Sequence, residues 1–518
     1  MVTLFASGLH RDRYESFFVL HTLLFILSMI IEKTCIFLLK PRQQFDTLSL
    51  RLRNYVSQTL EEVCMFEKQF KLAQHNTNVR TELMAGLTTF MTMAYILAVN
   101  PQILGATGMP ADGVLIATAL ASTIGCVMMA FMANLPFALA PGMGLNAYFA
   151  YTVVLGHGFS WQAALLAVFI EGIIFIILSL TNVREAIFNA FPLSLKHAVS
   201  AGIGLFIALI GFQNANLVIA NPATILARTS FISEFSTFGI TALLCFLGVI
   251  IIAWLSHHRV KGAILFGILI TWILGIIVQA IGIYVPNMEL GFFSLYPSFG
   301  LPSFTGFGQI VGQAFNFGAM NLKNIGDFLT IIFAFLFVDL FDTLGTLIGV
   351  ASKANMLDEQ GRLPRIKGAL LADAIGTSAG ALLGTSTVTT YVESAAGVAE
   401  GGRTGLTALT TGVLFLLAIL LAPIFISIPA FATGAALIYV GFLMLSSLLK
   451  LDFDDITEAI PAYFTVLAMP FFYSIADGIS FGVISYVVLN ALAGKAKKVS
   501  LLMYILALLF ILKYALLP

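Results

Sequence analysis

The chain has 518 residues, of which 59% are hydrophobic and only 10% charged, whereas about 25% of the residues in an average soluble domain are charged. This composition excludes a soluble globular protein, and apolar runs of roughly 20 residues along most of the chain predict membrane-spanning helices. The 26 basic and 26 acidic residues cancel, so no net charge attracts nucleic acid. The four cysteines, Cys35, Cys64, Cys126 and Cys245, are scattered, which indicates neither a disulfide framework nor a metal site.

Residues 1–64 differ from the rest of the chain. Phe17 to Ile31 form a short apolar run that His21 interrupts, and a polar basic segment from Lys33 to Arg80 follows. No small-residue cleavage site follows the run cleanly, which argues against a removed signal peptide. An anchor and an extra span both remain open, and we treat residues 1–64 as an extension of unknown role.

From Glu82 onward the sequence predicts about fourteen helical membrane segments, which begin near residues 83, 112, 137, 160, 190, 237, 261, 326, 367, 387, 404, 429, 457 and 476. A last apolar segment, 500–518, contains Lys513 and fits either an interfacial helix or a further span.

Loop charges give the orientation, because cytoplasmic loops carry an excess of lysine and arginine. With residue 80 in the cytoplasm, the outside loops carry only Arg228 and Lys323. The inside loops carry Arg80, Arg184, Lys196, Arg259, Lys261, Lys353, Arg362, Arg365, Lys367, Arg403, Lys450, Lys495, Lys497 and Lys498. The sequence therefore predicts a multi-pass protein with residue 80 and the 495–498 region both cytoplasmic.

Two halves of the chain resemble each other weakly at an offset of roughly 240 to 250 residues. Seven spans per half, an odd number, would insert the second half upside down, and such inverted repeats are typical of transporters. The third segment of each half, 137–155 and 385–400, is irregular: the first contains Pro141, Gly142 and Gly144, and the second is rich in threonine and serine. Paired broken segments at equivalent positions predict a substrate site.

Acidic residues within the spans are the strongest chemical signal, because each costs about 2.5 to 3.5 kcal/mol at a helix centre. Asp339 and Asp342 are three residues apart and so share a helix face, and Glu393 lies in the second broken segment. For each, the alternative is a polar contact between helices. Asp373 and Glu171 fit that structural role equally well.

A buried carboxyl group is suited to carrying a proton, and the pattern predicts no metal site and no cofactor. Asn146, in PGMGLNAYFAY, either binds a ligand or caps the broken helix. Phe90, Tyr148 and Tyr391 could stack on a flat ligand, but with 46 phenylalanines in the chain packing is the better explanation for any one aromatic.

Four strings carry a family resemblance: NTNVRTELMAGLTTFMTMAYILAVNP, ALAPGMGLNAYFAY, FVDLFDTLGTLIGVASKA and GTSTVTTYVESAAGVAEGGRTGLTAL. Over roughly residues 66–518 the chain resembles the AzgA-like adenine/guanine/hypoxanthine permeases of the nucleobase–cation symporter-2 family. The family usually begins near MFEKQFKLAQHNTNVRTE, so Met65 is the expected natural start and 65–518 the transporter domain.

The resemblance implies an all-α fold of 14 spans, a 7+7 inverted repeat with broken spans three and ten. Its core domain would cover approximately 82–180 and 325–425, and its gate domain approximately 183–285 and 427–495. It implies proton-coupled purine uptake across the cell membrane, the inner membrane in a bacterium, by an elevator movement of the core. A homodimer through the gate domain is expected by analogy with the wider family.

The resemblance also implies residue roles. The substrate-binding residues would be Glu393, Asp339, Asn146, Thr390, Tyr391 and Phe90, and the proton-coupling residues Asp342, Asp339 and Glu393. Two alternatives stay open: another cargo on the same fold, such as uracil, xanthine or an anion, and an intramembrane enzyme that uses Asp339 and Asp342. Acids at the site argue against an anion, and an inverted repeat argues against an enzyme.

Overall fold

The computed structural model describes residues 67–516 except 68, 182–190, 222–223, 233, 288–289, 291, 319, 321–324, 354–355 and 358–362. The expectations for residues 1–64 and for Met65 lie outside these residues. Contacts divide the chain into Met1–Glu67 and Lys68–Pro518, and the description below concerns the second unit.

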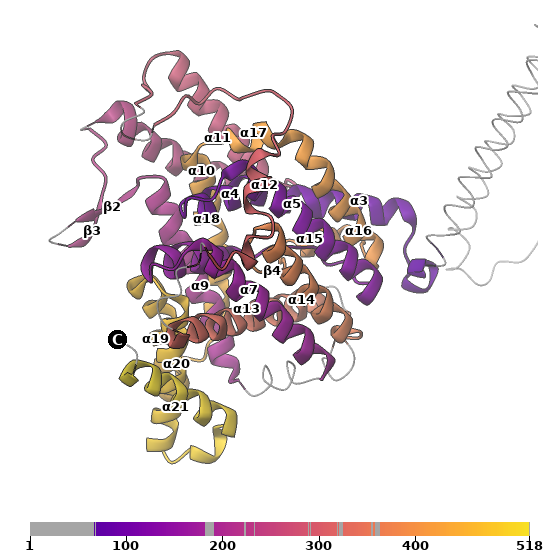
Figure 1. Ribbon diagram of the computed structural model, residues 1–518, viewed down its shortest axis with the longest axis vertical. Helices are drawn as coiled ribbons and strands as arrows, with labels where there is room; N and C mark the ends of the chain where they lie inside the picture. Colours follow the sequence, from indigo (N-terminus) through magenta and orange to yellow (C-terminus); the bar gives the residue numbers. More distant parts are fainter. Residues whose placement is uncertain are drawn as a thin grey trace, which may run out of the picture. The chain divides into compact units, whose positions relative to one another are not determined.

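Helices make up most of this unit (Figure 1). Their bounds are α3 Val79–Met93, α4 Ile96–Gly105, α5 Ala111–Met128, α6 Met143–Ala147, α7 Trp161–Leu180, α9 Leu193–Asn214, α10 Ile240–His257, α11 Ala263–Ala280, α12 Thr305–Ile310, α13 Ile325–Lys353, α14 Ile366–Leu383, α15 Ser394–Ala399, α16 Gly405–Ala418, α17 Ala422–Ile426, α18 Ala430–Leu445, α19 Ile456–Phe472, α20 Ile475–Leu492 and α21 Leu501–Leu516. The strands are β1 Leu139–Pro141, β2 Val218–Asn221, β3 Ile225–Arg228 and β4 Val388–Thr390.

Within the described residues, ten helical stretches are long and apolar enough to cross a membrane. The other predicted spans take different forms. Span eight is the 29-residue α13, span thirteen is the shorter α19, and spans three and ten are broken. The final segment forms α21, which packs along α20.

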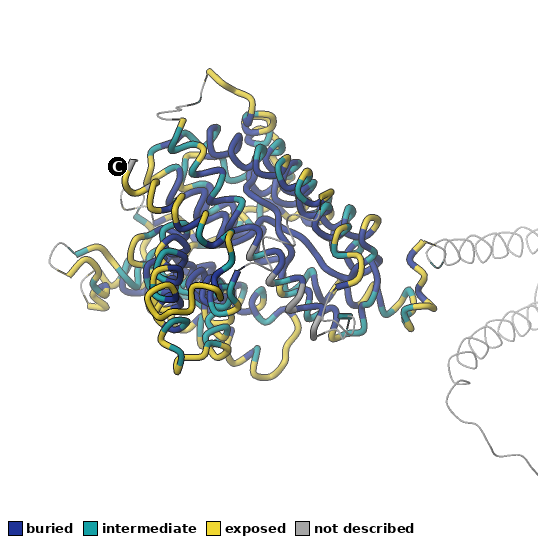
Figure 2. Tube along the Cα trace, turned by 90° about the horizontal axis from the view of Figure 1, so that it is seen from below, coloured by how far each residue is buried: buried dark blue, intermediate teal, exposed yellow. Residues whose placement is uncertain are grey.

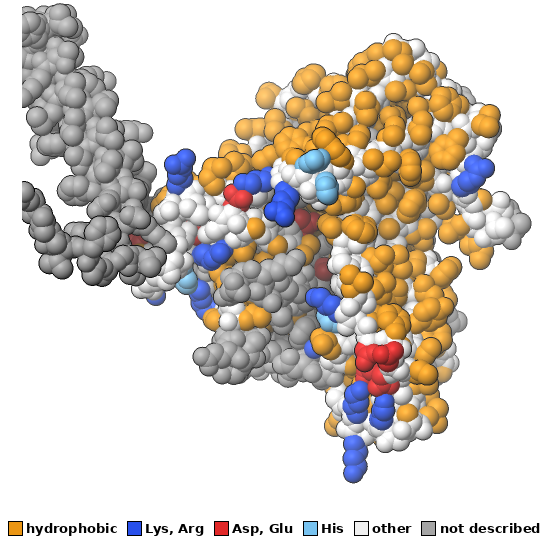
Figure 3. Space-filling model, turned by 180° about the vertical axis from the view of Figure 1, so that it is seen from behind, with side chains coloured by type: hydrophobic (Ala, Val, Ile, Leu, Met, Phe, Trp, Pro, Cys, Tyr) orange, Lys and Arg blue, Asp and Glu red, His pale blue; other side chains and the backbone are white. Residues whose placement is uncertain are grey.

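Large hydrophobic side chains cover much of the outer surface, as expected of a protein whose surroundings are lipid (Figure 3). Phe442 and Leu420, for example, are 64% and 65% exposed. Buried stretches of the chain lie in the interior of the helix assembly, and exposed stretches lie at its periphery and in the loops (Figure 2). The protein is therefore a multi-pass membrane protein.

Strands β1 and β4 come from the two broken spans and form a short antiparallel pair, with Leu139 opposite Thr390 and Pro141 opposite Val388. Each strand leads into a short helix, β1 into α6 and β4 into α15. A π-helix, Tyr148–Gly156, extends α6. Antiparallel pairing of equivalent strands is what a two-fold related, inverted repeat produces.

Helices α9 and α18 follow equivalent prolines, Pro192 and Pro429, each in an extended N-cap conformation. They pack antiparallel, because a Cβ built on Gly204 would lie 2.7 Å from the Gly441 carbonyl oxygen, and one on Gly211 would lie 2.8 Å from that of Gly434. Small residues let helix backbones approach closely in membranes. Equivalent helices thus run in opposite directions, which agrees with the inverted repeat.

The helices form two packed groups. In the first, α5 and α7 pack against α14, α13 packs against α7, and α16 packs against α3 and α5; in the second, α9 packs against α18 and α19, and α10 packs against α11 and α18. The broken spans lie with the first group, since β1 and β4 contact α5 and α14.

Candidate functional site

The two broken spans position the candidate site through backbone contacts around the strand pair. The Gly142 N–H donates to the Thr387 carbonyl at 3.0 Å, and the Tyr391 N–H donates to the Ala138 carbonyl at 3.0 Å. The Ala138 N–H donates to the Ser394 hydroxyl at 3.0 Å. These bonds satisfy backbone groups that irregular structure would leave unpaired at membrane depth.

Glu393 occupies the N-cap position of α15, three residues after the end of β4. The Tyr95 hydroxyl, at the junction of α3 and α4, donates to Glu393 Oε1 at 2.7 Å. Tyr95 is buried, whereas Glu393 is half-buried and its neighbour Val392 is 45% exposed. The Tyr95 hydroxyl therefore holds one oxygen of the carboxylate.

Thr390 is the last residue of β4. Its hydroxyl oxygen is buried and, within the described residues, has no hydrogen-bond partner. A buried polar group without a partner costs about 1 to 3 kcal/mol. A ligand that formed a hydrogen bond with the Thr390 hydroxyl, three residues before Glu393, would remove this cost.

Tyr391 and Asn146 hold the backbone of the site. The Tyr391 hydroxyl donates to the Pro141 carbonyl, and Tyr391 is nearly fully buried. Asn146 is completely buried; its amide donates to the Pro141 carbonyl at 3.4 Å and accepts from the Ser386 hydroxyl. These contacts tie span three to span ten, and a substrate-binding role for either residue stays a prediction.

Asp339 and Asp342 have different surroundings although they share one side of α13. Asp339 is completely buried, and the Thr343 hydroxyl lies 2.8 Å from its Oδ1 atom. Asp342 is half-buried beside Gly142, where a built Cβ would lie 3.4 Å from Asp342 Oδ2. Asp342, like Glu393, is thus an accessible acid next to a break in a span.

The remaining predicted residues lie in the packing around the strands. Glu171 on α7 accepts from the Thr387 hydroxyl at 2.8 Å, and Asp373 on α14 lies 2.8 Å from the Thr343 hydroxyl. The Phe90 ring packs edge-on against Phe415 of α16, with ring centroids 5.2 Å apart. That contact places Phe90 between helices, and its role in binding stays a prediction.

The sequence interpretation missed two residues, Tyr95 and Thr343. Nothing in the sequence around Tyr95 distinguishes it from the many other aromatic residues in the spans. Thr343 lies four residues after Asp339, a spacing that places both on one helix face, and that signal could have found it.

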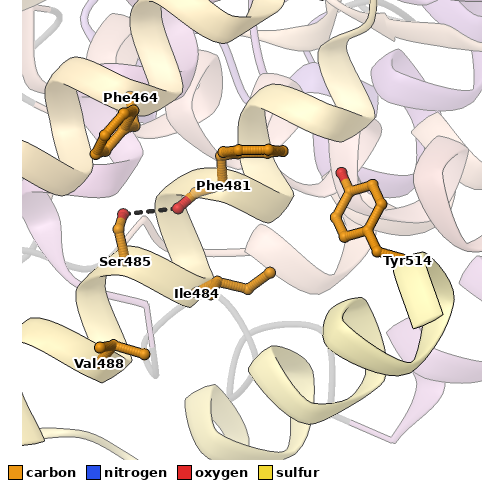
Figure 4. Close-up of a pocket in the computed structure, with 6 residues that line it drawn as sticks. All are labelled: Phe464, Phe481, Ile484, Ser485, Val488 and Tyr514. Atoms are coloured by element: carbon orange, nitrogen blue, oxygen red, sulfur yellow. Dashed lines mark hydrogen bonds between the residues drawn. The ribbon is translucent and has the colours of Figure 1, made fainter.

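A separate pocket lies between α19, α20 and α21 (Figure 4). Unlike the candidate site around β1 and β4, it is lined by no acidic residue in the part of the chain that the structure describes. It is lined by Phe464, Phe481, Ile484, Ser485, Val488 and Tyr514. Its Ser485 hydroxyl already donates to the Phe481 carbonyl at 2.6 Å, so the pocket offers a ligand little polar chemistry.

Among solved structures, the fold is similar to the transmembrane domain of a cyanobacterial bicarbonate transporter, BicA, with a TM-score of 0.55 at 16% identity over 78% of this chain and 97% of that one. This likeness concerns the fold alone.

Two curated relatives are much more similar in sequence. The adenine permease AdeP of Escherichia coli is 44% identical over 449 residues, 87% of this chain and 96% of AdeP. The guanine/hypoxanthine permease PbuG of Bacillus subtilis is 44% identical over 457 residues, 86% of this chain and 98% of PbuG. Residues 80–481 match the Permease family (Xan_ur_permease), to which this membrane transporter therefore belongs.

Proposed function

We propose that this protein takes up purine nucleobases, namely adenine, guanine or hypoxanthine, together with protons across the cell membrane. The cargo is supported by the relatives AdeP and PbuG, whose names state adenine and guanine/hypoxanthine. The observation that carries the proposal is Glu393, a half-buried residue at a break in a membrane span whose carboxylate is held by the Tyr95 hydroxyl.

The chemistry of a purine matches this arrangement. Its edges present ring N–H donors and ring nitrogen acceptors, with an amine or carbonyl group at C6. With Oε1 held by Tyr95, Glu393 Oε2 can accept from a ring N–H, and the Thr390 hydroxyl can donate to a ring nitrogen or accept from an N–H. Asn146 and Tyr391 would keep the two broken spans together around the bound base.

The proposed mechanism is an elevator with alternating access. The first helix group would be the moving core, approximately 82–180 and 325–425, and the second the gate, approximately 183–285 and 427–495. The packing of the helices into two groups supports this division. A homodimer through the gate stays a prediction that the mass of the detergent-solubilised protein would test.

Uptake of radiolabelled adenine, guanine and hypoxanthine into transporter-deficient cells tests the function. We expect saturable uptake that collapses with a protonophore, and loss of uptake in Glu393→Gln at an unchanged protein level in the membrane. Glu234→Gln, at an exposed loop position, is the matched control. No purine uptake by the correctly inserted protein would overturn the function, and full uptake by Glu393→Gln would overturn the role of Glu393.

Competition in the same assay separates the other cargoes. Unlabelled uracil, xanthine or bicarbonate should compete poorly with the preferred purine. Uptake that follows a sodium gradient and ignores the protonophore would overturn proton coupling.

Cross-linking tests the elevator. The Gln102 side chain on α4 accepts from the Thr433 hydroxyl of α18 and donates to the carbonyl of Ile428, which precedes α18, at 2.7 Å. Linking Gln102→Cys to Thr433→Cys with a short bismaleimide should stop uptake, since it would tie the two helix groups together, whereas either single variant should still transport. Uptake by the fully linked protein would contradict movement between the groups.

A further inference from the structure

The Thr343 hydroxyl lies at the centre of a completely buried polar cluster. Its oxygen is 2.8 Å from Asp339 Oδ1, 2.8 Å from Asp373 Oδ1 and 2.7 Å from the Thr389 hydroxyl oxygen. The four side chains come from α13, α14 and β4, and none is more than 1% exposed. Three helical or extended segments thus meet at one hydroxyl group.

A count of hydrogens constrains the protonation of this cluster. Each of the three oxygen–oxygen contacts needs a hydrogen between its atoms, because two lone pairs at 2.7–2.8 Å repel each other. A hydroxyl supplies one hydrogen and two acceptor sites. Thr343 and Thr389 therefore supply two hydrogens at most, and the third must come from a carboxyl group. This count does not depend on any other contacts that the two aspartates make.

We propose that Asp339 and Asp373 share one proton through the Thr343 hydroxyl, and that this pair carries the proton that is coupled to transport. The coupling of this proton to transport rests on the proposed function. Thr343 donates to the ionised carboxylate and accepts from the protonated one, and reversal of the hydroxyl exchanges the two roles. Binding of a proton forms one O–H bond and reduces the charge of the pair from two negative charges to one.

The cluster is connected to the substrate site through β4. Thr389, which contacts Thr343, precedes the orphan Thr390 in the same strand and lies opposite Ala140 of β1. When the pair loses its proton, one contact between Thr343 and an aspartate loses its hydrogen and becomes repulsive, so Thr343 shifts and the position of Thr389 in β4, which contacts it, shifts too. A proton on the aspartate pair and a base bound at Glu393 and Thr390 would therefore favour the same arrangement of β4.

The other titratable groups around the pair come from several elements. The described ones on α13, α14 and the elements packed against them include Asp327 and Asp342 on α13, Lys367 on α14, Glu171 on α7, Tyr391 and Glu393 around β4, Asp477 and Tyr486 on α20, Lys196 and His197 near the start of α9, and Asp112 and Cys126 on α5. Asp342 interacts electrostatically with both Asp373 and Glu393. Binding of a proton by the pair should therefore also relieve repulsion at the accessible acids.

Difference infrared spectroscopy on the purified full-length protein tests the pair without any substrate. A protonated carboxyl group has its own C=O stretching band, and Asp339→Asn and Asp373→Asn should each remove the same component at neutral pH. In Asp373→Asn the new side-chain amide would supply the missing hydrogen, which leaves Asp339 ionised. The matched control is Asp112→Asn. Asp112 lies on α5 and accepts a hydrogen bond from the Gly306 N–H, so this variant should keep the component.

The bridge is tested by Thr343→Val, which keeps the shape and removes the hydroxyl. The component should then titrate at a pH lower by about one unit, because the protonated pair loses its hydrogen bonds, and Thr343→Ser should restore the original midpoint. Survival of the component in Asp373→Asn, or an unchanged midpoint in Thr343→Val, would overturn the proposal. If the protein takes up no purine, the proposed function fails while this spectroscopic test still decides the pair.

Discussion

The Thr407 hydroxyl donates a hydrogen bond to the completely buried Glu82 carboxylate at 2.6 Å, across 325 residues of chain. The same carboxylate accepts from the backbone N–H groups of Arg403, Thr404 and Thr407 at 2.8, 3.3 and 3.2 Å. Glu82 thus satisfies three of the backbone donors around the start of α16, where the N-cap hydroxyl of Thr404 accepts from the Leu406 N–H and Asn134 accepts from the Gly405 N–H. The acid of the NVRTE string in the first helix is a cap for a helix of the second half.

Glu82→Ala should lower the thermal unfolding temperature of the detergent-solubilised protein by several degrees. The substitution leaves several buried N–H groups without an acceptor, and each such group costs about 1 to 3 kcal/mol. Glu82→Gln keeps one acceptor oxygen and should have an intermediate effect, whereas Glu234→Ala at an exposed position should have none. An unfolding temperature for Glu82→Ala equal to that of the unmodified protein would show that water replaces these bonds.

Gly397→Ala should reduce purine uptake at least tenfold. A Cβ at Gly397 would overlap the Thr89 hydroxyl and lie 2.6 Å from the Ala85 carbonyl oxygen, both on α3. Helix α15 would have to move away from α3, and Glu393 at its N-cap would move with it. Gly105→Ala, where a Cβ meets nothing within 4 Å, is the control. Normal uptake by Gly397→Ala would mean that the packing of α15 on α3 does not position Glu393.

Tyr95→Phe should raise the KM for purine uptake by roughly tenfold without reducing the amount of protein in the membrane. The variant removes a charge-assisted hydrogen bond to Glu393, and such bonds contribute about 1.5 to 3 kcal/mol. Tyr463→Phe, at a side chain that is 53% exposed, is the matched control. Kinetics identical to those of the unmodified protein would show that Glu393 is oriented by other contacts.

Thr390→Val separates binding from stability. Removing a buried hydroxyl without a partner should leave the unfolding temperature unchanged or slightly higher, while the KM for uptake rises by roughly five-fold if the hydroxyl binds the base. Thr377→Val, in contrast, should lower the unfolding temperature, because the Thr377 hydroxyl donates to the Val388 carbonyl at 2.9 Å and accepts from the Val388 N–H at 3.2 Å. A destabilised Thr390→Val with normal KM would mean that Thr390 serves the fold.

The sequence predicts the spans and the broken segments well because their signals are local. Hydrophobic runs, proline and glycine within a span, and acids at membrane depth can each be recognised without knowing what lies beside them. The resemblance adds the order of the spans and the expected role of Glu393.

Tertiary packing decides what the sequence could not. Tyr95 and Glu393 are 298 positions apart, so no spacing rule joins them. Asp339 and Asp342 share a helix face, yet one is completely buried and the other accessible, because α14 and β4 place Asp373 and Thr389 around Thr343. Asp373 gains its proposed role only from that placement.

The charged cluster at the predicted cytoplasmic end should not contribute to the pH dependence of uptake. The Lys495 ammonium, 2.9 Å from Asp455 Oδ2, holds the pKa of that carboxyl well below its usual range, and the Thr457 hydroxyl and N–H add to the effect. A carboxyl with a lowered pKa contributes stability that is complete above its ordinary pKa of about 4 and is lost only as the pH falls through the lowered value.

The second ion pair of this cluster acts on a base. The hydrogen bond from Lys498 to Glu458 raises the pKa of Lys498, which therefore stays charged. Between about pH 5.5 and 7.5 the charges of Asp455 and Lys498 therefore do not change. Asp455→Asn should therefore keep the shape of the pH–uptake profile, whereas Thr343→Val should displace it towards lower pH; equal displacement in both variants would place the proton-dependent step at the cytoplasmic cluster.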